Sequence, residues 1–102
     1  MHLVTRPRFY LDVAEEVEYL ATKAGSETAL RWKKCLNDTI AGLLLHPHLG
    51  RLRSDLQPSG IRSWRVERFS RWLIFYATKE DALVLLRVRY GMMDLPTLEF
   101  GS

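Results

Sequence analysis

The stretch that decides the fold is Arg71–Tyr90, which reads RWLIFYATKEDALVLLRVRY. It contains two short apolar runs, WLIFY at 72–76 and ALVLL at 82–86, with a polar turn between them. Runs of this length, bounded by turn residues, predict two strands, Arg71 to Ala77 and Ala82 to Tyr90. The second run is apolar at consecutive positions, so we expect both of its faces to be buried and the strand to be central rather than at an edge of the sheet.

Upstream of these strands, the segment between Pro7 and Pro47 predicts two helices. Pro7 suits the first turn of a helix, Gly25 suits its C-terminal cap, and Ser26 suits the N-cap of the next helix. Pro47 ends the second helix because it disfavours helical backbone at the preceding residue. Joined by about two residues, the helices should form an antiparallel hairpin. Apolar residues recur at helical spacing on one face of each helix: Phe9, Val13, Val17 and Leu20 in the first, and Ala29, Trp32, Leu36, Ile40, Leu43 and Leu44 in the second.

Two shorter strands complete the predicted sheet, Leu3–Thr5 and Arg62–Val66. Residues 47–60 are rich in proline and glycine and are expected to form a loop. The predicted order is β-α-α-β-β-β, an α+β class in which a helical hairpin packs on one face of a mostly antiparallel sheet. The other face would stay open as the working surface. We expect residues 1–102 to form a single domain.

Composition narrows the classes of function. Hydrophobic residues make up 47% of the chain and aromatic residues 11%, enough for a packed core. The chain has one cysteine, no secretory signal and no apolar run long enough to span a membrane, which predicts a cytoplasmic protein. His46 and His48 flank Pro47 without further ligands, so no metal is expected. No cofactor is expected either, since no glycine-rich phosphate loop is present.

Arginine is concentrated in the second half of the chain. Between Arg51 and Arg71 there are six arginines against two acids, a local excess of four positive charges in a chain whose net charge is +3. Such asymmetry favours an anionic partner, either nucleic acid or an acidic protein. The alternative is a solvated sheet face with a few ion pairs. The candidate partner- or target-binding residues are Arg51, Arg53, Arg62, Trp64, Arg65, Arg87 and Arg89.

Chemistry, if the chain performs any, would depend on Arg87 and Tyr90. An arginine could stabilise the charge of a phosphorane and a tyrosine could move protons during phosphodiester cleavage assisted by a 2′-hydroxyl. Strand alternation places Arg87 and Arg89 on one face and Tyr90 on the other, which disfavours a joint Arg-Arg-Tyr site. The alternative is an arginine pair that bonds acids of the fold or of a partner. For Trp64, base stacking and core packing are both open.

The chain resembles the RelE/ParE superfamily of type II toxins, and most closely its ParE, or plasmid-stabilisation, branch. The likeness covers nearly the whole chain. It rests on the predicted order of elements and on the phrases Thr39-Ile40…Leu43…His46-Pro47…Gly50-Arg51, Gly60-Ile61-Arg62, Leu73-Ile74-Phe75-Tyr76 and Leu86-Arg87-Val88-Arg89-Tyr90-Gly91-Met92-Met93-Asp94.

The resemblance implies a small bacterial toxin of the cytoplasm that a cognate antitoxin neutralises. The C-terminal segment of the antitoxin would wrap the toxin along the helical hairpin and the sheet, giving a toxin–antitoxin hetero-oligomer. The ParE branch implies inhibition of DNA gyrase. The RelE branch implies ribosome-dependent mRNA cleavage, but Leu73 and Met92-Met93 stand where that pattern places basic residues. A third reading is a toxin fold that has lost toxicity and acts only in an autorepressing complex.

Overall fold

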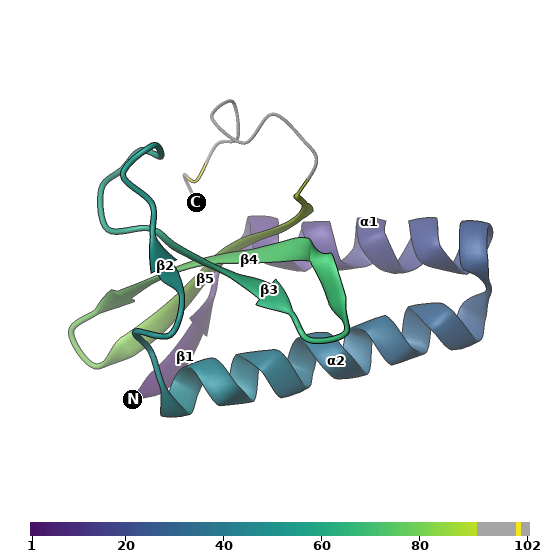
Figure 1. The fold of residues 1–102 in the computed structure, drawn as a ribbon, viewed down its shortest axis with the longest axis horizontal. Helices are drawn as coiled ribbons and strands as arrows, with labels where there is room; N and C mark the ends of the chain where they lie inside the picture. The colour runs from purple at the N-terminus through teal and green to yellow at the C-terminus, as the bar shows by residue number, and fades with distance from the viewer. Residues whose placement is uncertain (92–99, 101–102) are drawn as a thin grey trace.

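The computed structural model describes residues 1–91 and Phe100. It shows two helices packed against a five-stranded sheet with strand order β1-β5-β4-β3-β2 (Figure 1). Strand β1 is parallel to β5, and the other neighbours are antiparallel. The predicted α+β class is therefore confirmed, and so is the prediction that β5 is an interior strand rather than an edge strand. The elements in chain order are β1 His2–Thr5, α1 Pro7–Ala24, α2 Ser26–Leu45, β2 Arg51–Leu52, β3 Arg62–Val66, β4 Phe69–Lys79 and β5 Ala82–Tyr90.

The helical hairpin forms where the sequence predicts it, with one difference at the turn. Helix α1 begins at Pro7, and a single residue, Gly25, separates it from α2. Gly25 has a φ of 97°, which a residue with a Cβ rarely adopts. The prediction that Ser26 is the N-cap of α2 is wrong, because Ser26 is the first helical residue and Gly25 takes the cap position. Helix α2 ends at Leu45, before Pro47 as expected.

The sheet contains one strand more than predicted. Arg51–Leu52, in the segment expected to be a loop, forms β2 and pairs with β3. Two residues are too few to show a strand period, which explains why the pattern did not reveal it. Strand β4 begins at Phe69 rather than Arg71, because the turn lies at Glu67-Arg68 and Arg68 takes a positive φ of 69°. Strands β3 and β5 have the predicted bounds.

Both faces of the sheet carry buried apolar side chains. The hairpin covers one face (Figure 1). Trp32, Leu36, Leu43, Ile74 and Val88 are buried between the helices and this face. The expectation of an open opposite face is wrong over part of its area. There the segment after β2 supplies Leu56 and Ile61, and Phe100 joins them over Phe75, Val84 and Leu86. The apolar run of β5 is explained by these two cores, because its residues alternate between them.

The pairing of β4 with β5 has a register shift next to Arg87, one of the candidate residues of β5. Phe75 pairs with Arg87, whereas Tyr76 pairs with Leu85, so Leu86 is an extra residue opposite the β4 ladder. A bulge of this kind changes the alternation of side chains along a strand. Leu83 and Leu85 belong to the helix-side core before the bulge, and Val88 belongs to it after the bulge.

Candidate functional site

Arg87, the arginine that sequence reasoning placed nearest to chemistry, forms a buried ion pair within the domain. Its side chain is 3% exposed, and its Nε and Nη2 donate to the carboxylate of Asp12 at 2.6 and 3.0 Å. Asp12 is 1% exposed. Two bonds from one guanidinium to both oxygens of a carboxylate give a strong and directional pair. Two roles were considered for Arg87, catalysis and pairing with an acid of the fold or of a partner. The structure shows it paired with an acid of the fold.

The position of Asp12 follows from the geometry of the sheet edge. Strand β1 pairs only with Ala82–Leu85 of β5, so among residues 1–91 the rest of that side of β5 has no neighbouring strand. Helix α1 follows β1, and Asp12 accepts a hydrogen bond from the backbone N–H of Val88 at 3.2 Å. The carboxylate thus takes the place of a strand partner for this N–H. Arg89 donates to the same carboxylate at 3.3 Å and to the exposed Glu15 at 3.2 Å.

Sequence reasoning did not single out Asp12 or Glu16. Both lie on the stripe of α1 that also carries Phe9 and Leu20, and both are buried. An acid on the apolar face of an amphipathic helix is seldom buried unless it is paired. That was the signal available in the sequence, and it pointed to buried cationic or donor partners elsewhere in the chain.

Tyr90, the second candidate for chemistry, lies beside a cluster of aromatic rings. Its ring is 5.0 Å from that of Trp72, at an interplanar angle of 77°. The Tyr90 hydroxyl accepts a hydrogen bond from Arg71 at 3.3 Å. The indole Nε1 of Trp72 donates to Glu16 at 2.5 Å. Tyr90 and Trp72 therefore lie together beside helix α1, whereas Arg87 is held by Asp12.

Arg53 is also buried, against the other face of the sheet. Its guanidinium is paired with Asp55 through bonds of 2.9 and 2.6 Å, donates to Ser63 and lies over the ring of Phe75. The hydrogen bonds from Arg53 lower the pKa of the Asp55 carboxyl to about 2. Arg53 thus anchors the segment after β2 to the sheet.

The segment that contains His46, Pro47 and Gly50 packs around the hydroxyl group of Tyr76. Tyr76 donates to the carbonyl of Pro47 and accepts from the N–H of Gly50, both at 2.8 Å. A Cβ on Gly50 would lie 2.5 Å from this hydroxyl oxygen, so the position needs glycine. Arg62 donates to the Gly50 carbonyl at 2.8 Å. Burial raises the pKa of Tyr76, because the phenolate would be desolvated.

The remaining candidates are partly or fully exposed. Arg51 and Arg65 are exposed, and the guanidinium of Arg65 lies 4.7 Å from the centre of the Trp64 ring. Trp64 is half-buried and packs against the helix-side core, so core packing accounts for part of its surface. The structure thus separates the predicted binding residues into a buried group, Arg53 and Arg87, and a more accessible remainder. Their roles in binding stay predictions.

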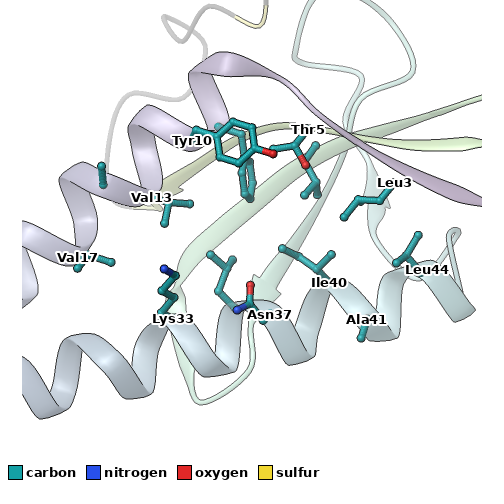
Figure 2. Close-up of a pocket in the computed structure, with 14 residues that line it drawn as sticks. Leu3, Thr5, Tyr10, Val13, Val17, Lys33, Asn37, Ile40, Ala41 and Leu44 are labelled. Atoms are coloured by element: carbon teal, nitrogen blue, oxygen red, sulfur yellow. The ribbon is translucent and has the colours of Figure 1, made fainter.

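An apolar groove runs between the two helices and has a volume of about 630 Å³ (Figure 2). Tyr10 and Val13 of α1 face Lys33, Asn37 and Ile40 of α2 across it. Lys33 is the charged residue among the described lining residues and has no ion pair with any of them. We call this feature the hairpin groove; its lining is Leu3, Thr5, Phe9, Tyr10, Val13, Ala14, Val17, Lys33, Leu36, Asn37, Ile40, Ala41, Leu44 and Leu85.

Comparison with known proteins decides the family. Residues 3–95 match the model of the family described as "ParE toxin of type II toxin-antitoxin system, parDE". The chain belongs to the ParE toxin family. Its fold is similar to a solved structure described as "Chromosomal ParDE TA system from P. aeruginosa", with a TM-score of 0.75. That likeness has 20% sequence identity and covers 88% of this chain and 95% of the other. A search of curated proteins finds no significant match.

Two further observations concern membrane-spanning helices and metal-binding clusters in this ParE toxin. Neither of its two described helices combines the length and the apolar character that a membrane crossing needs. Within residues 1–91 and Phe100, no three histidine, cysteine or acidic side chains are grouped so that they could bind a metal ion. The phrase Met92-Met93, where the family pattern places a basic residue, lies outside the described residues.

Proposed function

We propose that this ParE toxin acts by binding and inhibiting DNA gyrase, and that a cognate antitoxin neutralises it. Its membership of a toxin family of type II toxin–antitoxin systems supports both parts. The similar solved structure is described as a ParDE toxin–antitoxin system, which supports a protein partner of this kind.

Because Arg87 is buried, we favour binding to a protein target over cleavage of RNA. A catalytic arginine must reach the phosphate whose charge it stabilises. The Arg87 guanidinium is 3% exposed and bonded twice to Asp12, so contact with RNA would require this network to open. Leu73 on β4 adds an apolar side chain where the nuclease branch keeps a basic one. The domain therefore offers its exposed arginines as docking contacts for a protein target.

The hairpin groove supports the proposed antitoxin site. An amphipathic helix binds such a groove by placing its apolar face inside it, with anchors spaced at helical intervals. Lys33 stands within the groove and would pair with a carboxylate of the bound segment. A net charge of +3 and the exposed Arg51 and Arg65 favour an acidic partner by electrostatic complementarity.

The target is tested by induction of the chain alone and by an assay of supercoiling. We expect the isolated chain to slow growth, to induce the DNA-damage response before translation falls, and to inhibit supercoiling by purified gyrase. Transcript cleavage that Arg87→Ala abolishes would instead assign the chain to the endonuclease mechanism. Normal growth together with unimpaired gyrase would leave only the autorepressing role and would refute the proposed target.

The antitoxin site is tested with a charge reversal inside the groove and a matched one outside it. Lys33→Glu should weaken binding of the protein encoded by the neighbouring reading frame roughly tenfold or more, since a buried interfacial charge loses its partner. Arg31→Glu changes the same charge two residues away, at an exposed position of α2 that does not line the groove, and should have little effect. Equal weakening by both variants would argue for general electrostatic attraction rather than docking in the groove.

A further inference from the structure

A second cavity lies where the helical hairpin extends beyond the end of the sheet. It has a volume of about 580 Å³, within the range of about 300–1,000 Å³ typical of small-molecule sites. Helix α1 supplies Glu16, Tyr19 and Lys23, and the strands supply Trp72 and Tyr90. Figure 1 shows the hairpin reaching past the strands on this side of the molecule. We call this cavity the end pocket; it does not share lining residues with the hairpin groove.

The walls of the end pocket are aromatic. The rings of Trp72 and Tyr90 meet nearly at right angles, with an interplanar angle of 77°, and form a corner. Tyr19 lies along α1 and is 53% exposed, so its ring is accessible from solvent. Aromatic surfaces of this kind stack with planar ligands, and each stacked base contributes about 1–3 kcal/mol in nucleic-acid complexes.

The carboxylate of Glu16 lines the pocket and can distinguish ligands that present hydrogen-bond donors from ligands that present acceptors. Glu16 is 9% exposed, and its Oε1 accepts from the indole of Trp72. Its Oε2 accepts no hydrogen bond from the described residues and is not among their buried unpaired polar atoms, so it is accessible from the cavity. A ligand that presents N–H donors can therefore bond to it. A ligand that presents an acceptor there would be repelled.

The entrance of the pocket is bordered by positive charge. Lys23 lines it, and Arg71 bonds the hydroxyl of Tyr90 from an exposed position. The second acid of the lining, Glu15, is paired with Arg89. The end pocket therefore has an inner carboxylate and outer cations. This polarity fits a ligand with donors at its inner end and negative charge at its outer end.

We infer that the end pocket binds a guanine nucleotide. Guanine presents two adjacent N–H donors, N1–H and the N2 amino group, which the Glu16 carboxylate can accept at Oε2 and at the lone pair of Oε1 that Trp72 does not use. The other bases place an acceptor next to each donor on the same edge, so Glu16 would disfavour them. The base would lie against the aromatic walls while the phosphate meets Lys23 and Arg71, as charged groups of this type commonly do. The inference concerns a site separate from the hairpin groove and does not rest on inhibition of gyrase.

The experiment measures binding of fluorescently labelled GMP and AMP to the purified 102-residue chain by anisotropy. We expect GMP to bind at least about tenfold more tightly than AMP. Glu16→Gln should reduce GMP binding roughly 10- to 100-fold, because the amide replaces an acceptor by a donor. Glu18→Gln is the matched control, since Glu18 is exposed on the same helix and does not line the pocket. Thermal unfolding of both variants verifies that they fold.

Further binding measurements distinguish a free nucleotide from a base within an RNA strand and test the competing explanations. A single-stranded RNA with one central guanine that binds more tightly than GMP would identify a base within a strand, and the reverse would identify a free nucleotide. Equal affinity for GMP and AMP, or equal loss in both glutamine variants, would overturn the inference. So would binding of arginine amide in preference to GMP, because that result would make the pocket a site for a cationic side chain.

Discussion

Asp12→Ala tests whether the buried arginine network holds the domain together. The substitution removes a carboxylate that accepts from Arg87, Val88 and Arg89 and leaves a guanidinium that is 3% exposed without this partner. Removal of one member of a buried ion pair typically costs about 3–5 kcal/mol. The total stability of a domain is about 5–15 kcal/mol, so this loss is a large fraction of it.

The assay is equilibrium unfolding in urea at neutral pH, with thermal unfolding as a second measurement. For a small domain, 1 kcal/mol corresponds to about 4–8 °C, so a loss of 3 kcal/mol lowers Tm by roughly 12–24 °C. Glu15→Ala is the control on the same helix. Its carboxylate is 66% exposed and pairs with Arg89 at 3.2 Å, and an exposed pair contributes about 0–1 kcal/mol.

A double-mutant cycle with Arg87→Leu separates the pair from other effects of each substitution. Replacement of both members of a buried pair by apolar groups is often neutral, so the double variant should be more stable than the sum of the single losses predicts. A loss below about 1 kcal/mol for Asp12→Ala, or strict additivity in the cycle, would refute a structural role for the network. Arg87 would then be available for contact with a partner or substrate.

Three further predictions concern the segment around β2. Gly50→Ala should destabilise the domain by about 1–3 kcal/mol, measured by urea unfolding, because a Cβ there would lie 2.5 Å from the Tyr76 hydroxyl and 3.0 Å from the Ser63 carbonyl oxygen; an unchanged midpoint would contradict the close approach. Burial raises the pKa of Tyr76 above its usual 10.0, so its contribution to stability is complete below pH 10 and is lost as pH rises through the folded pKa. Absorbance of phenolate should therefore show one tyrosine ionising later than the others or together with unfolding, and Tyr76→Phe should remove that step. The pKa of Asp55 is lowered to about 2 by Arg53, so its contribution is present above its usual value of 3.8 and is lost as pH falls toward 2; the difference in unfolding midpoint between wild type and Asp55→Asn should vanish near pH 2, and a difference that persists there would exclude the ion pair as its source.

Much of the fold could be read from local patterns. The apolar stripes of both helices, Gly25 between them and the boundaries of β3 and β5 follow from periodicity and from backbone preferences that act within a few residues. The missed elements lacked such a signal. Strand β2 has two residues, and its existence depends on hydrogen bonds from β3. The cover on the second face of the sheet depends on where residues near Leu56 return after a loop.

The sequence by itself determined that this chain forms a helical hairpin on a sheet with β5 as an interior strand, that arginine is concentrated in its second half, and that it resembles ParE toxins. Only the tertiary structure decided which arginines are internal. Arg87 and Asp12 are 75 residues apart in the chain, and their bond depends on α1 passing the side of β5 that β1 leaves unpaired. Periodicity reports which face of an element is buried, because it arises within that element. It carries no information on which charges meet across two elements, since that is set by their packing.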